Sequence, residues 1–145
     1  MNQKVVDELV ADGRITRVPV NPAGSRILLT QAARHLESAG AIAATDPSLA
    51  YVALYDAARK SVLAHMLAHG YRELVRPGAH QAVVEYAVAA VGDSTAVEAL
   101  RRLDRLRRNR NRSEYDSWEP SPKTIESDLV HARAIFDLVS SLLAE

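Results

Sequence analysis

Apolar residues recur every three to four positions along most of this chain, which is the period of an amphipathic helix. The pattern predicts helices over residues 5–11, 25–44, 47–69, 79–91 and 95–112, and a last helix that begins at Ser121-Pro122. That last helix has an apolar face formed by Ile125, Leu129, Ala132, Phe136, Val139 and Leu143. Alanine and leucine are abundant and β-branched runs are scarce. We therefore expect an all-α fold, an antiparallel helical bundle of four main helices plus a short N-terminal helix.

Prolines, glycines and capping side chains set the expected helix boundaries. Ser25 is expected to cap the second helix, with Ile27 among its inward-facing residues. Thr45-Asp46-Pro47 supplies a capping side chain and then a proline for the first turn of the third helix, and Gly70 ends that helix. Residues 14–24 are expected to be irregular, so we divide the chain into an N-terminal helix and arm over residues 1–24 and a helical domain over residues 25–145.

The third helix is apolar on nearly every face, which predicts a central position or a surface shared with a partner. A second copy of the chain could cover such a surface. Asp56 interrupts the apolar stripe of this helix, and a buried carboxylate requires a cationic partner. Two arginines are candidates, Arg59 one turn along the helix and Arg110 from another helix. The alternative is an Asp56–Arg59 pair at the surface.

Arginines are concentrated in one segment of a chain whose net charge is zero. Residues 101–112 hold seven arginines and one acid, a net charge of +6, which leaves −6 on the rest of the chain. This distribution indicates a local anion-binding patch, with Arg107, Arg108 and Arg112 as candidate contacts to nucleic-acid phosphates. Two alternatives are open: a solvated helix neutralised by acids from elsewhere in the fold, and an arginine-rich helix that docks an acidic partner protein.

Arg110 continues the helical face marked by Ala99, Leu103 and Leu106. An arginine on an apolar stripe tends to face a neighbouring helix or a groove. Asn111 follows it directly and Tyr115 comes five residues later. This arrangement predicts a small polar site where the helix finishes.

Other features narrow the function classes. The chain has no cysteine, and no apolar run approaches the roughly 20 residues of a membrane span, so we expect a soluble cytoplasmic protein. His65 and His69 have the i, i+4 spacing of metal ligands but lack a further ligand nearby, so we expect no metal and no cofactor. Trp118, the only tryptophan, could cover the core or stack on a base.

The segment Arg110-Asn111-Arg112-Ser113-Glu114-Tyr115 resembles the motif of the HEPN superfamily, small all-α domains of prokaryotic toxin–antitoxin and defence systems. The family motif is an arginine, then Asn or Asp, then a histidine four to six residues after the arginine. Two further segments are similar to family features: Tyr55 to Lys60 to its second helix, and Gly78-Ala79-His80 to a turn before the next helix. The resemblance covers about residues 25–143.

The resemblance implies metal-independent RNA cleavage, with Arg110 binding phosphate, Asn111 orienting the site and Asp56 supporting the arginine. A cognate antitoxin is the implied partner. HEPN domains commonly pair, so the resemblance, together with the apolar third helix, predicts a symmetric homodimer. Tyr115 stands where the family has histidine, and a phenol with a pKa near 10 is a poor base at neutral pH. His80 and His131 could replace it only through the fold. We therefore expect RNA or nucleotide binding, with at most weak ribonuclease activity. The alternative is a non-catalytic protein-interaction domain.

Overall fold

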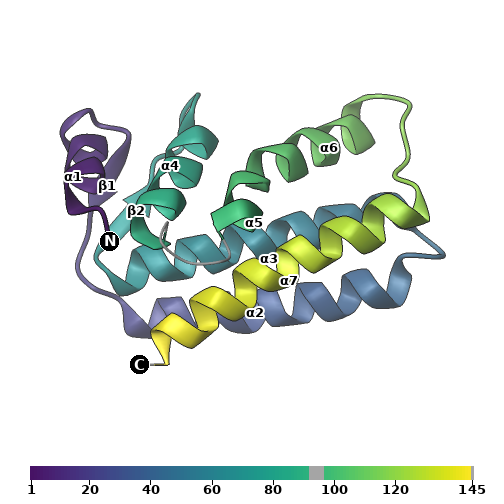
Figure 1. Ribbon diagram of the computed structural model, residues 1–145, viewed down its shortest axis with the longest axis horizontal. Helices are drawn as coiled ribbons and strands as arrows, with labels where there is room; N and C mark the ends of the chain where they lie inside the picture. The colour runs from purple at the N-terminus through teal and green to yellow at the C-terminus, as the bar shows by residue number, and fades with distance from the viewer. Residues whose placement is uncertain (92–96, 145) are drawn as a thin grey trace.

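Three long helices form the centre of the molecule in the computed structural model, which describes residues 1–91 and 97–144 (Figure 1). These helices are α2 (Pro22–Ile42), α3 (Pro47–Ala68) and α7 (Pro122–Leu143). Helix α3 runs in the same direction as α7 and opposite to α2. Helix α6 (Leu103–Tyr115) lies across the top of this group, antiparallel to α3. The all-α bundle expected from the sequence is therefore confirmed.

The remaining elements gather at one end of the bundle. They are α1 (Gln3–Ala11), β1 (Ile15–Arg17), β2 (Tyr71–Glu73), α4 (Ala79–Val91) and α5 (Val97–Arg101). Strands β1 and β2 pair antiparallel, with Thr16 opposite Arg72. The sequence predicted irregular structure for residues 14–24, so β1 corrects that prediction. The pairing and the packing of α1 on α4 join residues 1–24 to the helical domain.

Helix starts follow the capping rules, although one cap was misplaced. The Asp46 carboxylate accepts a hydrogen bond from the Leu49 amide at 3.2 Å, as the sequence predicted for the start of α3. The cap of α2 is Asn21 instead of Ser25, because Pro22 fits the first turn and allows the helix to begin earlier. Ser25 is buried, and its hydroxyl donates to the Ala64 carbonyl at 2.8 Å. Ile27, expected to face inward, is 59% exposed.

The predicted arginine helix over residues 95–112 is two helices, α5 and α6, which meet at Arg102. Its predicted start at residue 95 lies outside the described residues. Helix α6 continues to Tyr115, beyond the predicted end, and an ion pair between Arg110 and Glu114 stabilises its last turn.

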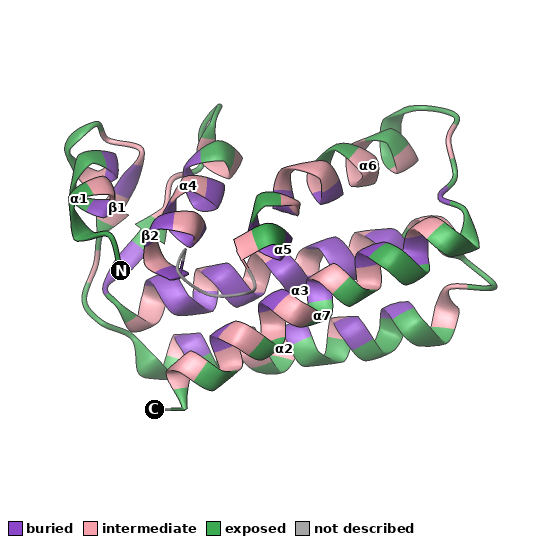
Figure 2. Cartoon of the chain, in the orientation of Figure 1, coloured by how far each residue is buried: buried purple, intermediate pink, exposed green. Residues whose placement is uncertain are grey.

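Helix α3 is the core of the molecule, as its apolar sequence predicted. It packs against α2, α6 and α7, and Figure 2 shows its predominantly buried surface. Eleven of its 22 residues are buried within a single chain. Much of the apolar surface from which we predicted a homodimer is thus used inside the protomer, and the homodimer stays a prediction. No helix among the described residues is long and apolar enough to cross a membrane.

Candidate phosphate-binding site

A network of four hydrogen-bonded side chains fixes α6 on the side that faces α7. The Asp128 carboxylate, fully buried on α7, accepts hydrogen bonds from the Tyr51 hydroxyl at 2.6 Å and from Arg105 Nη2 at 3.1 Å. Asn109 Nδ2 donates to the same Tyr51 hydroxyl at 3.2 Å. Burial and the bond to Asp128 raise the pKa of Tyr51, so its hydroxyl stays protonated and donates. We call Tyr51, Arg105, Asn109 and Asp128 the closed network, because each has a partner within it.

A second polar group lies where α3, α4 and α6 meet, and we call it the open cluster: Tyr55, His80, Asp104 and Arg107. The Tyr55 hydroxyl is 3.1 Å from His80 Nδ1. On the other side of the ring, Nε2 is 3.5 Å from an Asp104 carboxylate oxygen, which is long for a hydrogen bond. This Nε2 atom is buried and has no hydrogen-bond partner among the described residues. The open cluster is therefore less completely satisfied than the closed network.

The open cluster holds one positive and one negative side chain, Arg107 and Asp104, beside the imidazole of His80. Burial, followed by repulsion from Arg107, lowers the pKa of His80 to about 4 despite the attraction of Asp104. Arg59 and Arg107 oppose the effect of burial, which raises the pKa of Tyr55. Asp104 is shared with Arg108, whose Nε is 3.4 Å from it. Arg107 itself has no carboxylate within ion-pair distance in the described part of the chain.

The candidate catalytic residues predicted from the sequence lie on two helices. Arg110, Asn111 and Tyr115 are at the end of α6, and Asp56 is on α3. Arg110 is half-buried, as its position on the apolar stripe implied. Its Nη1 donates to Asn111 Oδ1 at 3.2 Å and is 3.1 Å from a Glu114 carboxylate oxygen, whereas its buried Nε has no partner among the described residues. Tyr115 is 78% exposed and forms no side-chain hydrogen bond with the described residues. The structure thus brings Arg110 and Asn111 together and leaves Tyr115 in solvent.

Asp56 is half-buried on α3, and neither predicted arginine forms an ion pair with it. Arg59 pairs instead with Glu73 of β2. Burial and then the Lys60 charge lower the pKa of His35, and the Asp56 charge partly opposes this shift. Lys60 Nζ and His35 Nε2 are 2.9 Å apart. The support that the HEPN resemblance assigns to Asp56 for Arg110 therefore stays a prediction.

The arginine run is largely neutralised by acids from α5, α6 and α7. Ion pairs join Arg102 to Glu98, Arg105 to Asp128, Arg108 to Asp104 and Arg110 to Glu114. Among the nucleic-acid contacts that we predicted, Arg108 is in one of these pairs and Arg112 stacks on Trp118, with its guanidinium carbon 4.3 Å from the ring centroid. Only Arg107 of the three has neither kind of partner in the described chain. Trp118 also contacts Tyr51 edge-on, which connects it to the closed network.

His65 and His69 contact each other as stacked rings, with centroids 4.1 Å apart. His65 Nδ1 lies 2.9 Å from the Tyr86 hydroxyl, and His69 Nδ1 lies 2.8 Å from the His65 carbonyl oxygen. Burial, followed by the charge of His69, lowers the pKa of His65 to about 4. Within the ranges that the structure describes, no three His, Cys, Asp or Glu side chains are grouped as metal ligands would be.

Sequence reasoning missed most of the polar residues that meet in the fold. Asp128 had a detectable signal, because it lies on the apolar stripe between Ile125 and Ala132, as Asp56 does on its own helix. His80 was considered only as a base that the fold might supply. Tyr55 and Asp104 gave no comparable signal.

No protein-family model, curated protein or solved structure matches this chain. The resemblance to HEPN domains therefore depends on its motif residues.

Proposed function

We propose that this chain is a HEPN-like domain that binds RNA or a nucleotide, with a phosphate group held by Arg107 beside His80. The observation that carries the proposal is the guanidinium of Arg107 in the open cluster, which has no ion-pair partner among the described residues. Every other arginine between Arg102 and Arg112 has a carboxylate or an aromatic ring as its partner. Within the described chain, Arg107 is thus the half-buried arginine of α6 that is free to bind an anion, and a guanidinium matches the geometry of a phosphate.

The surroundings of Arg107 favour an anion. Its charge acts on both His80 and Tyr55, so a phosphate bound there would be near an imidazole and a phenol as well as a guanidinium. The Arg59 charge from α3 also acts on His80 and Tyr55, although Arg59 is paired with Glu73 of β2. Partial burial reduces screening by solvent, so each of these contacts is stronger than it would be on an open surface.

Catalysis is a separate part of the proposal and concerns the end of α6. The hydrogen bond from Arg110 to Asn111 joins the first two residues of the HEPN motif, which supports a phosphate-binding role for Arg110. Tyr115 supplies no efficient base at neutral pH. We therefore expect slow, metal-independent RNA cleavage that requires Arg110.

The cleavage prediction has a direct test in Tyr115→His. General acid–base assistance is typically worth roughly 10²–10⁴-fold, so the histidine should accelerate cleavage of a labelled RNA measurably. Arg110→Ala should abolish cleavage in both backgrounds, assayed with a chelator present. Fast cleavage by the unmodified protein would show that another residue supplies the base.

Binding is tested with a labelled single-stranded RNA by fluorescence anisotropy, at salt concentrations from about 50 to 200 mM. Arg107→Ala should weaken binding roughly tenfold or more and make it less sensitive to salt. The matched control is Arg101→Ala, which removes an exposed arginine from the same run outside the open cluster.

Comparing the RNA affinities of Arg107→Ala and Arg101→Ala distinguishes a specific phosphate site from general electrostatic attraction to the arginine run. Equal small losses from both would indicate a diffuse electrostatic surface and no phosphate site. RNA binding that is absent at all salt concentrations would contradict the proposed function and favour the alternative, an arginine-rich helix that docks an acidic partner protein.

A further inference from the structure

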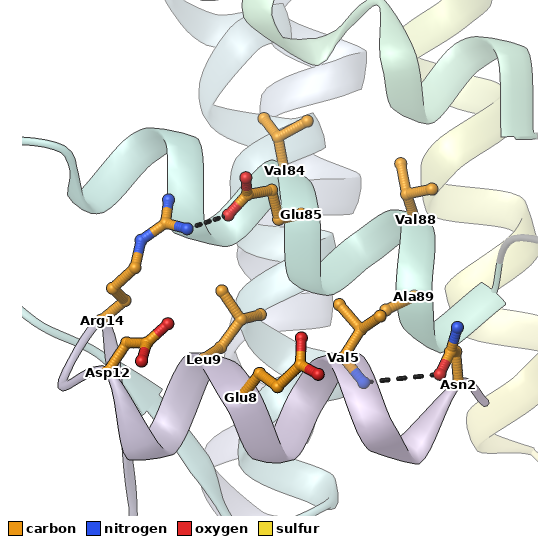
Figure 3. A pocket seen from close by; sticks show the side chains of 10 residues that line it. All are labelled: Asn2, Val5, Glu8, Leu9, Asp12, Arg14, Val84, Glu85, Val88 and Ala89. Carbon is orange, nitrogen blue, oxygen red and sulfur yellow. Dashed lines mark hydrogen bonds and ion pairs between the residues drawn. The ribbon is translucent and has the colours of Figure 1, made fainter.

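A groove between α1 and α4 lies apart from the open cluster and shares no residue with it. Its volume is about 590 Å³, within the range of binding pockets for small ligands or a few side chains. Figure 3 shows α1 along one wall and α4 along the other, with an ion pair between Arg14 and Glu85 at one end and Asn2 near the other. The side chains that line it are Asn2, Val5, Glu8, Leu9, Asp12, Arg14, Val84, Glu85, Val88 and Ala89.

The apolar part of the groove comes from both helices. Leu9 of α1 and Val84 and Ala89 of α4 are buried at its base, whereas Val5 and Val88 are only half-buried. Half-buried valines that line a groove gain stability when an apolar side chain covers them. The groove therefore favours an occupant with at least one aliphatic side chain.

The acidic residues near α1 differ in whether they have partners within the described chain. Asp7 is satisfied within the protein, because its carboxylate accepts hydrogen bonds from Arg17 at 3.1 Å and from Gln3 at 3.0 Å. Glu8 and Asp12 line the groove one helical turn apart, and neither forms an ion pair with a described residue. Glu85 is paired with Arg14, so the lining has a net charge of −2.

We propose that this groove docks a basic amphipathic helix of a partner protein. Aliphatic side chains of the partner would cover Val5 and Val88, and lysine or arginine residues one turn apart would pair with Glu8 and Asp12. Charge complementarity selects this occupant over an acidic segment. Helix α6 of a second copy is also basic, but its Leu103 and Leu106 are buried in their own core and cannot reach the groove.

The proposal can be tested with a synthetic helical peptide that has leucines at i and i+4 and lysines placed to reach Glu8 and Asp12. Binding is followed by amide NMR shifts of the full chain and by fluorescence anisotropy. The largest shifts should fall on α1 and α4. The double variant Glu8→Gln/Asp12→Asn should bind the peptide roughly threefold to tenfold more weakly.

A matched control makes the same charge change elsewhere: Glu126→Gln/Asp137→Asn alters two exposed acids of α7 and should bind as the unmodified chain does. A peptide with glutamates in place of the lysines should bind more weakly, and so should one with serines in place of the leucines. Shifts centred outside α1 and α4, or equal affinity of the two double variants, would overturn the proposal. Because none of these changes touches Arg107, RNA binding should persist in every variant.

Discussion

The two sides of helix α6 differ in how completely their polar groups are satisfied. On the side facing α7, Asp128 receives two hydrogen bonds and is fully buried. On the other side, where α6 meets α3 and α4, His80 has a buried nitrogen without a partner and Arg107 has no carboxylate among the described residues. One helix thus carries a closed network and an open cluster.

This difference suggests that the closed network serves the stability of the fold and the open cluster serves ligand binding. A buried ion pair that is fully hydrogen-bonded fixes the position of a helix, because breaking it leaves a charge without a partner in the core. A cluster with an unsatisfied buried nitrogen, and with an arginine outside any ion pair among the described residues, contributes less to folding and retains capacity for an anionic ligand. We infer that the closed network holds α6 in place so that the open cluster can bind phosphate.

The largest expected effect is the loss of stability on breaking the closed network. Asp128→Ala removes the acceptor for Tyr51 and Arg105 and should destabilise the fold by about 3–5 kcal/mol in urea denaturation. Asp104→Ala, the matched change in the open cluster, removes a partly exposed carboxylate and should cost less than about 1 kcal/mol. Equal losses from both variants would contradict the distinction between the two sides.

The next effect in size is acid sensitivity from two histidines. His65 and His80 have folded-state pKa values of about 4, below the ordinary value of 6.5. Their contribution to stability is fully present above pH 6.5 and is lost as pH falls toward 4, because the unfolded chain binds protons that the folded chain does not. At a pH near 5, each histidine should lower the free energy of unfolding by about 2 kcal/mol relative to its value at neutral pH.

Single substitutions assign this pH dependence to the two sites. His80→Gln and His65→Gln should each flatten the fall in urea-measured stability between about pH 7 and pH 5. Only His80→Gln should also alter RNA affinity, because His65 contacts Tyr86 in the core and lies outside the open cluster. An unchanged pH dependence in both variants would mean that other groups govern it.

The sequence predicted local features well and long-range polar contacts poorly. The cap at Asp46 and the half-buried position of Arg110 depend on residues within one helix, so periodicity and capping rules were sufficient. Tyr55 and His80 are 25 residues apart and come from different helices, so only the packing of α3 against α4 brings them together.

The predictions from the sequence also missed strand β1, Asp128 and the ion pairing of Arg59. Strand β1 has three residues, too few for an alternating pattern to be recognised. Asp128, in contrast, could have been predicted. It lies on the apolar stripe of α7, and an acid in such a position needs a partner, which is the argument that we made for Asp56 alone. Neither arginine predicted as a partner of Asp56 forms an ion pair with it, and Arg59 pairs with Glu73 of β2.

The central claim is that phosphate binds between Arg107 and His80, and NMR titration of the histidine ring protons tests it most directly. Adding 5′-AMP to the full chain should shift the His80 resonances and raise the pKa of His80, because a bound anion stabilises the imidazolium. His65, buried elsewhere in the core, should not move and serves as the internal control. Arg107→Ala should remove the effect on His80. Saturable AMP binding that leaves the His80 resonances and pKa unchanged would contradict the account.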